Sequence, residues 1–202
     1  MKPVRAPIDL PAWLVEITSE GRFTVGATDD SRMQAAIDLA HRNLAERTGG
    51  PFAAIVVEET SGQCVAAGVN LVVSSGLSLA HAEAIAIMLA QLRAGTYDLA
   101  GSKRQRYSLY ATGQPCIMCF GILWWSGITK LVCGARAEDI ERIAHFREGP
   151  LPADWPQILS QRKDLPPISV VQDVHRAAAC EVLQTYMSGG HPVYNPGSTV
   201  GD

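Results

Sequence analysis

The sequence contains no apolar run close to the ~20 residues that a helix needs to cross a bilayer, so we expect no membrane-spanning segment. Prolines and charged residues interrupt residues 1–17, which therefore lack the apolar core of a secretory signal peptide. Positive charge is also scarce, because 17 Lys and Arg residues stand against 20 Asp and Glu residues, for a formal net charge of −3. These absences predict a cytoplasmic protein and disfavour nucleic acid and membrane surfaces as partners.

Cysteine is sparse and odd in number. Five cysteines in a chain without an export signal do not suggest a disulfide framework. The one dense basic stretch, "SKRQR" at residues 102–106, is expected to be a solvated loop, as most charge runs are. By contrast, 47% of the 202 residues are hydrophobic and only 18% are charged, so the chain can bury the core of one domain.

Strand-like and helix-like patterns alternate along the chain, which predicts a layered α/β domain over residues 29–188. Residues 1–28, punctuated by proline and glycine, are expected to form an extended N-terminal arm, and residues 189–202 a C-terminal tail. Strands are expected at residues 52–59, 64–73, 107–112, 130–135 and 168–174. Helices are expected at residues 29–48, from His81 onward, and at residues 115–126, 137–144 and 176–187. The first helix has three candidate caps, Asp29, Asp30 and Ser31.

The apolar stretch "AHAEAIAIML" at residues 80–89 contains two polar residues near its start. His81 alone has an ordinary explanation, because a lone histidine on an apolar face is more often a core residue than a metal ligand. Cys116 and Cys119 have C-x-x-C spacing, which by itself is compatible with a redox pair, a zinc site or coincidence. Together, one imidazole and two thiolates make a three-ligand zinc set that leaves a fourth position open for water, as catalytic zinc sites do.

Both motifs lie at predicted helix starts, where the positive end of the helix dipole stabilises thiolates. Glu83 cannot point in the same direction as His81, two residues away, so it is free to face the open zinc position. A carboxylate there can take a proton from the water and deliver it to a substrate nitrogen. The alternative is a closed zinc site with a fourth protein ligand and no turnover. The remaining histidines, none of which is an obvious fourth ligand, are His41, His145, His175 and His191.

His81-Ala82-Glu83 followed by Pro115-Cys116-Ile117-Met118-Cys119 matches the H-x-E and P-C-x-x-C signature of zinc-dependent deaminases. Beyond this signature, the chain resembles the cytidine/deoxycytidylate deaminase superfamily, and within it the bacterial guanine deaminases, over about residues 30–187. The stretches that carry the resemblance are "GGPFAAIVV" (49–57), "AAGVN" (66–70), "AHAE" (80–83), "PCIMCFGILWWSGITKLVCGAR" (115–136), "HFREGP" (145–150) and "VYN" (193–195).

The resemblance implies a three-layer α/β/α sandwich around a central five-stranded mixed sheet, with Zn²⁺ as the cofactor. It also implies hydrolytic deamination of guanine to xanthine and ammonia by a homodimer that takes a small nucleobase as its substrate. In this interpretation His81, Cys116 and Cys119 hold the metal, and Glu83 is the proton shuttle.

Further residues receive roles from the resemblance alone. Phe52 would pack against the base and Asn70 would hydrogen-bond the purine, although an ordinary core position and a turn cap would also explain them. The backbone N–H and carbonyl of Ala82 would lie by the base edge or the leaving amine. Trp125 would form an aromatic wall, but because Trp124 is its neighbour on the same helix, only one of the two can face the site squarely.

The C-terminal part of the chain completes the implied site. Phe146 and Glu148 would form a loop in which an aromatic residue is followed by an acidic group. Glu148 would read the amino and N1–H edge of guanine and act as a second catalytic residue, unless it is a solvated loop charge. Tyr194 would close the site as part of a lid, unless the tail is disordered.

Three residues depart from the family pattern. Gln114 stands where glutamate is usual and Ile117 where proline is usual, and both would tune a helix start. Arg147 lies where some relatives have aspartate, and a cation would repel the donor-rich edge of guanine unless it points away. The substrate therefore stays open between guanine and another amino-heterocycle, such as the triazine ammeline, cytosine or a nucleoside. Deamination of adenosine in tRNA is disfavoured by the net charge of −3.

Overall fold

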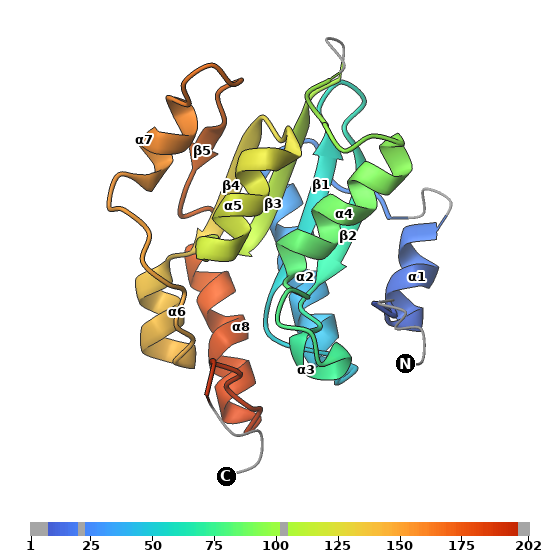
Figure 1. Ribbon diagram of the computed structural model, residues 1–202. Coiled ribbons are helices and arrows are strands. Elements are labelled where there is room, and N and C mark those ends of the chain that lie inside the picture. Colours follow the sequence, from blue (N-terminus) through green and yellow to red (C-terminus); the bar gives the residue numbers. More distant parts are fainter. Residues whose placement is uncertain (1–7, 20–22, 102–104, 198–202) are drawn as a thin grey trace, which may run out of the picture.

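Five strands form a mixed sheet at the centre of the protein (Figure 1). A computed structural model describes residues 8–19, 23–101 and 105–197. The strands are β1 (Ala53–Glu58), β2 (Gln63–Val69), β3 (Tyr107–Gly113), β4 (Lys130–Ala135) and β5 (Ser169–Val171). Their order is β2-β1-β3-β4-β5, with β1 antiparallel to both of its neighbours and with β3, β4 and β5 running parallel. The predicted five-stranded mixed sheet is confirmed.

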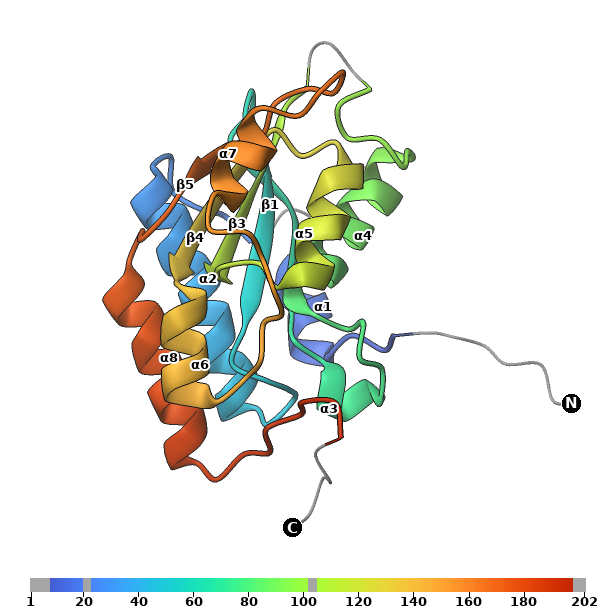
Figure 2. The same cartoon turned by 60° about the vertical axis from the view of Figure 1, so that its left-hand side comes forward.

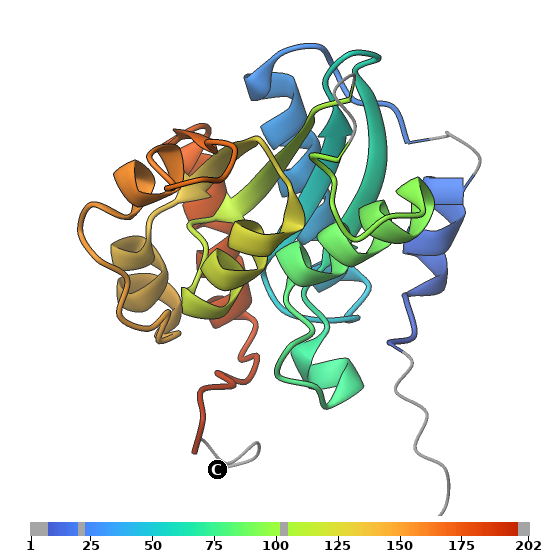
Figure 3. The ribbon, with the colours of Figure 1, turned by 45° about the horizontal axis from the view of Figure 1, so that its top comes forward.

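Helices cover both faces of the sheet. The helices of the described residues are α1 (Ala12–Thr18), α2 (Asp29–Ala45), α3 (Val72–Ser75), α4 (Ala82–Ala94), α5 (Ile117–Ser126), α6 (Ala137–Ala144), α7 (Trp155–Ser160) and α8 (Arg176–Ser188). Figures 2 and 3 show α2, α6 and α8 on one side of the sheet, with α4 and α5 on the other. The residues of β1 are buried along the whole strand, as expected of a strand covered on both faces. The three-layer architecture predicted from the sequence is therefore confirmed.

Helix α4 approaches the sheet closely at Gly68 of β2. A Cβ atom added at Gly68 would lie 2.6 Å from the backbone nitrogen of Ala86 and would overlap the carbonyl oxygen of Ala82. Because glycine has no Cβ atom, the backbone of the first turn of α4 can rest directly on β2. This contact places the start of α4, with His81 and Glu83, at a defined height above the sheet.

Several local predictions were wrong. Residues 12–18 form α1 rather than part of an extended arm, because burial of Trp13 and Leu14 against the core stabilises a helix there. Strand β2 ends at Val69 rather than at residue 73, and the chain turns into α3. Helix α7 was not predicted. The helix predicted from Pro115 begins at Ile117 instead, because Cys116 has an extended backbone and is its N-cap.

The start of α2 also differs slightly from the prediction. Its N-cap is Thr28, whose hydroxyl accepts a hydrogen bond from the backbone nitrogen of Ser31 at 3.1 Å. The Ser31 hydroxyl in turn accepts from the Thr28 nitrogen at 3.1 Å, which completes a reciprocal cap. Of the predicted arm, residues 1–7 and 20–22 lie outside the described residues, as do residues 102–104 of the basic stretch and residues 198–202 of the tail.

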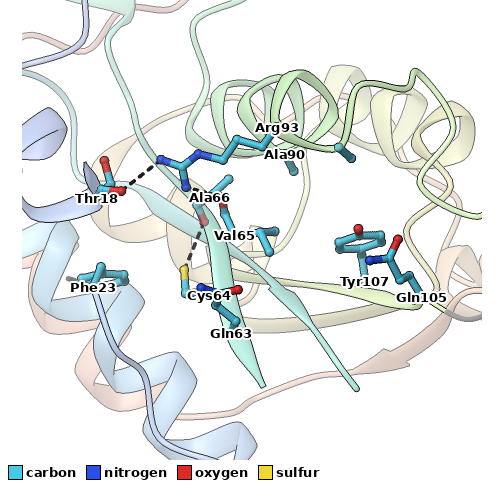
Figure 4. Close-up of a pocket in the computed structure, with 11 residues that line it drawn as sticks. Thr18, Phe23, Gln63, Cys64, Val65, Ala66, Ala90, Arg93, Gln105 and Tyr107 are labelled. Atoms are coloured by element: carbon cyan, nitrogen blue, oxygen red, sulfur yellow. Dashed lines mark hydrogen bonds between the residues drawn. The ribbon is translucent and has the colours of Figure 1, made fainter. Parts of the chain in front are cut away.

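The outer edge of β2 is closed by a side chain from α4. Figure 4 shows Arg93 between β2 and the end of α1. Its guanidinium group donates one hydrogen bond to the carbonyl of Val65 in β2 and another, of 3.0 Å, to the carbonyl of Thr18. An arginine that hydrogen-bonds a carbonyl at the edge of a sheet protects the strand from pairing with another chain. A cavity of about 540 Å³ lies beside this contact and includes no candidate catalytic residue.

No helix in the described part of the chain combines the length and the apolar character that a membrane crossing requires.

An ion cluster joins α6 to α8 and gives a test of the fold. Asp139 is nearly buried and receives hydrogen bonds from Arg176 at 2.6 and 3.0 Å and from Arg142 at 3.1 Å. Hydrogen bonds from Arg176 lower the pKa of Asp139 from 3.8 to about 2. Because the pKa is depressed in the folded state, its contribution to stability is present above pH 3.8 and is lost as pH falls toward 2.

We therefore expect Asp139→Asn to lower the urea midpoint at pH 7, and the difference from wild type to shrink below about pH 4. Glu181→Gln, at an exposed position of α8, is the matched control and should leave the midpoint unchanged. An equal loss for Asp139→Asn at every pH would contradict this explanation.

Candidate metal centre and active site

The starts of α4 and α5 bring one imidazole and two thiols together. His81 is the N-cap of α4, Cys116 is the N-cap of α5, and Cys119 lies in the first turn of α5. The Nδ1 atom of His81 lies 3.5 Å from the Sγ atom of Cys116 and 3.6 Å from that of Cys119. The candidate ligand atoms of all three residues lie within 4.8 Å of one another.

These distances suit a tetrahedral zinc ion. With Zn–S bonds of about 2.3 Å and Zn–N bonds of about 2.0–2.1 Å, tetrahedral angles would separate each sulfur–nitrogen pair by about 3.6 Å. Two cysteines and one histidine are also the donor types that zinc prefers in proteins. His81, Cys116 and Cys119 are therefore positioned to bind a metal ion, and their donor atoms suit zinc.

A fourth protein ligand is not found in the part of the chain that the structure describes. The three residues form a complete group there, and His41, His145, His175 and His191 are not part of it. A site with three protein ligands leaves one position open for water, which is the arrangement of catalytic zinc.

The thiols share a hydrogen bond in addition to their contacts with His81. The hydrogen bond from Cys119 lowers the pKa of Cys116 to about 4, and the same contact raises the pKa of Cys119. The backbone nitrogen of Cys119 also donates to the Cys116 sulfur, at 3.4 Å. The first turn of α5 therefore stabilises negative charge on Cys116, as expected at the start of a helix.

Glu83 lies in the first turn of α4 beside the three ligands. Its side chain is buried, with 8% of the residue exposed. Burial raises the pKa of Glu83, and the nearby charge of Cys116 raises it further. An upward shift of this kind favours the protonated carboxyl group, as in catalytic acids and bases.

A cavity of about 210 Å³ is lined by two of the candidate ligands, His81 and Cys116, and by Glu83. The other predicted site residues that line it are Phe52, Asn70, Phe146, Glu148 and Tyr194. The aromatic residues among them form one wall, since the ring centres of Phe52 and Phe146 are 5.6 Å apart and those of Phe146 and Tyr194 are 4.5 Å apart. Residues from five distant stretches of the sequence thus meet in one place.

A model of the cytidine and deoxycytidylate deaminase zinc-binding region matches residues 27–135, which include the three ligands and Glu83. The chain belongs to this deaminase family. It is similar to the solved structure of guanine deaminase from Nitrosomonas europaea, with 39% identity, a TM-score of 0.82, and 93% of this chain and 98% of that chain covered.

Two curated relatives of this chain have different activities. Guanine deaminase of Bacillus subtilis (strain 168) is 35% identical over 94 residues, which are 46% of this chain and 56% of that protein. The tRNA-specific adenosine deaminase of Buchnera aphidicola subsp. Schizaphis graminum (strain Sg) is 36% identical over 107 residues, which are 52% of this chain and 66% of that protein. Each match therefore spans only about half to two thirds of the curated relative.

Asn70 of the deaminase acts as a turn cap and still has a free donor. It is buried at the end of β2, and its Oδ1 atom accepts a hydrogen bond from the nitrogen of Val72 at 3.2 Å. Its backbone nitrogen donates a hydrogen bond of 2.9 Å to the carbonyl of Phe52, and its carbonyl accepts one of 3.1 Å from the nitrogen of Gly50. Within the described residues we find no acceptor for its Nδ2 group, and Asn70 is one of the residues that line the cavity.

Glu148 is partly buried rather than a solvated loop charge. Burial, followed by the charges of Cys116 and Glu83, raises the pKa of Glu148 to about 8. The side chain of the neighbouring Arg147 is exposed. Arg147 nevertheless lines the cavity together with Glu148, so a cation and a carboxyl group lie side by side at this part of the site.

Three residues of the C-terminal tail, Tyr194, Asn195 and Pro196, line the cavity. Tyr194 packs on Phe146, and its hydroxyl is buried without a hydrogen-bond partner among the described residues. Burial raises the pKa of Tyr194, so the hydroxyl stays protonated. A buried hydroxyl without a partner is costly, and a polar group of a ligand in the cavity would satisfy it.

Two predicted site residues are placed differently. Trp125 does not line the cavity of its own chain; 79% of its surface is exposed on α5, because the next turn of the helix points away from the zinc ligands. Trp124 packs into the core instead. The carbonyl of Ala82 lies against Gly68 of β2, and Ala82 is not among the residues that line the cavity.

Other residues that line the cavity were not predicted, among them Gln114 and Asn195. Gln114 accepts a hydrogen bond from the nitrogen of Ala137 at 3.2 Å and so connects the cavity to the start of α6. Asn195 follows Tyr194 directly in the stretch "VYN". The only reason in the sequence to consider Asn195 was its position next to Tyr194. That position did not predict a contact with residues 145–148.

Proposed function

We propose that this protein is a zinc-dependent aminohydrolase that converts guanine and water to xanthine and ammonia. The proposal depends on one observation above all, the cavity in which Glu83, Glu148 and the free donor of Asn70 surround the open side of the metal site. An acid–base group, a carboxyl group for the amino edge and a donor for a ring acceptor are what a guanine ring requires. Phe52 and Phe146 supply an apolar wall against which a flat ring can pack.

The size of the cavity favours a free base. Its volume of about 210 Å³ is below the ~300–1,000 Å³ of sites that take drug-sized ligands. A nucleoside would need additional room for its sugar, and an adenosine in a tRNA loop would need an open path for its neighbours. Tyr194 and the next two residues of the tail line the cavity and reduce the room for a sugar or for neighbouring nucleotides.

The mechanism assigns a proton to each carboxyl group. When bound, zinc supplies the Lewis acid that lowers the pKa of a water molecule from about 16 toward about 7. Glu83 accepts the proton of this water on a carboxylate oxygen and delivers it to ring N3 while the water oxygen attacks C2. Glu148 accepts hydrogen bonds from the exocyclic amine. Because its pKa is raised to about 8, Glu148 can take the proton of the new C2 hydroxyl and pass it to the amine, and the C2–N bond then breaks to release ammonia and leave the C2 carbonyl of xanthine.

A substrate panel tests the proposed function. Ammonia release by the zinc-loaded protein should be fastest with guanine when guanine, guanosine, cytosine, adenine and ammeline are compared at steady state. Faster release from ammeline or cytosine would replace guanine with another amino-heterocycle. No release from any of them would reject the enzyme and favour a zinc-stabilised binding module.

We also propose that the protein acts in the cytoplasm in purine catabolism. All five cysteines are free, which suits a reducing compartment and the thiolate form that the zinc site needs.

The exposed face of α4 and α5 supports a homodimer. Its large apolar side chains with more than a third of their surface exposed are Met88, Leu92, Tyr97, Ile117 and Trp125. A shallow hollow between the two helices includes Trp125 and Met118, and Met118 also lines the cavity of the active site. Aromatic and methionine side chains are enriched at protein interfaces, and a second copy on this face would cover one side of the site.

Trp125→Glu should therefore shift the protein from dimer to monomer in sedimentation velocity experiments. A charge at the centre of an apolar interface loses its hydration when the interface closes. Leu165→Glu changes an exposed apolar residue elsewhere and is the control. A Trp125→Glu variant that remains dimeric would place the interface on another face.

A further inference from the structure

The side chain of Asn195 joins the tail to the segment that carries Glu148. Its Oδ1 atom accepts a hydrogen bond from the backbone nitrogen of Arg147 at 2.9 Å, and its Nδ2 group donates to the carbonyl of His145 at 2.8 Å. One amide thus satisfies a donor and an acceptor on residues that are two apart. A side chain that makes both contacts fixes the segment in position and in orientation, because neither contact can be kept if the backbone rotates.

The same segment is anchored at its other end beside the metal site. The carbonyl of Glu148 accepts a hydrogen bond from the nitrogen of Ile117, the first residue of α5, at 2.9 Å. Before the segment, His145 ends α6 with a left-handed backbone, at φ 59°. Between these two points the backbone of residues 145–147 receives two side-chain hydrogen bonds within the described residues. Both come from Asn195.

Phe146, Arg147 and Glu148 all line the cavity, but they differ in exposure. Phe146 is buried against Tyr194, Arg147 is exposed, and Glu148 is partly buried. Such an alternation of exposure is typical of an extended backbone, in which a change of register by one residue exchanges the two faces. A rotated segment would therefore turn the guanidinium of Arg147 further into the cavity and move the carboxyl of Glu148 toward solvent.

We propose that Asn195 is a positioning residue that keeps Glu148, rather than Arg147, directed at the substrate, and that it couples closure of the tail to placement of this acid. The inference rests on the proposed deamination of guanine for its kinetic test. Asn195 acts through Glu148 and makes no contact with the reacting atoms itself.

The test compares Asn195→Ala with wild type, alone and in a Glu148→Gln background. Asn195→Ala should lower kcat for guanine at least about tenfold, the scale of two lost hydrogen bonds, with zinc content unchanged. In the Glu148→Gln background the same change should cost less than about twofold, because the group through which Asn195 acts is already gone. Asn195→Asp keeps the acceptor for Arg147 but not the donor to His145, and should lie between Asn195→Ala and wild type. Gln184→Ala, which removes an exposed amide from α8, should match wild type.

Hydrogen exchange supplies a readout that does not depend on turnover. The Arg147 amide should exchange faster in Asn195→Ala than in wild type, and should be unchanged in Gln184→Ala. Unchanged exchange at Arg147 would overturn the clamp whatever the substrate is. An equal loss of kcat in the presence and absence of the Glu148 carboxyl would show that Asn195 supports only the fold. If wild type released no ammonia from guanine, the proposed function would fail, and exchange at Arg147 would still decide whether the clamp exists.

Discussion

Glu83→Gln should lower kcat for guanine by a factor of about 10²–10⁴ while the protein keeps its zinc. The amide has nearly the shape of the carboxyl group, so the buried position beside the ligands stays filled. The amide cannot take a proton from water and deliver it to the ring. Glu83 is the acidic residue in the first turn of α4, so no other carboxyl group in that turn can replace it. The loss should therefore appear in kcat, with a smaller change in KM.

The measurement is ammonia release at steady state together with metal analysis of the same sample. Glu181→Gln makes the same chemical change at an exposed position of α8 and should leave both quantities unchanged. Turnover by Glu83→Gln at near the wild-type rate would mean that another group moves the proton. Loss of zinc in this variant would instead assign Glu83 to the metal site.

Cys119→Ala should abolish zinc binding and, with it, activity. Cys119 is fully buried, and the first turn of α5 places its sulfur 3.6 Å from Nδ1 of His81. Removing one of three protein ligands leaves too few donors to hold the ion against dilution, and it leaves the other two unpaired in a buried site. Zinc per chain after dialysis should fall from about one to near zero. His81→Ala and Cys116→Ala should behave in the same way.

Cys133→Ala is the matched control, because Cys133 is also buried but its thiol contacts the carbonyl of Val171 in β5 rather than the ligands. This variant should keep full zinc content. In the wild-type protein, zinc-edge absorption should report two sulfur ligands, one nitrogen and one oxygen. A second nitrogen or a third sulfur would indicate a closed structural site, and full zinc content in Cys119→Ala would reject the assignment of that ligand.

The two results are complementary. One variant keeps the metal and loses the proton shuttle, and the other loses the metal and keeps Glu83. If both variants fail to bind zinc, Glu83 belongs to the metal site together with Cys119. If only Cys119→Ala loses zinc, the preorganised contact of α4 with β2 at Gly68 is sufficient to position the site.

The chemistry of the metal site was determined by the sequence alone. Histidine and two cysteines are zinc ligands by their chemistry, and glutamate is an acid–base group. Residues two or three apart at the start of a helix also lie close together in space, so the spacing alone predicts that each pair meets. The same is true of the regular elements. The apolar runs of β1, β3 and β4 and the capped, periodic pattern of α2 are local signals, and each was found within a few residues of its predicted place.

Tertiary structure decided the features that depend on packing between distant segments. Residues 12–18 became α1 because Leu14 reaches the core, and Trp125 lies at the surface because of the direction in which α5 leaves the metal site. The contact of Asn195 with His145 and Arg147 spans 50 and 48 residues of sequence. No local pattern encodes such a contact, because an amide can cap a turn, hydrogen-bond a base or clamp a loop. Only the folded chain, by placing one partner and excluding others, determines which of these it does.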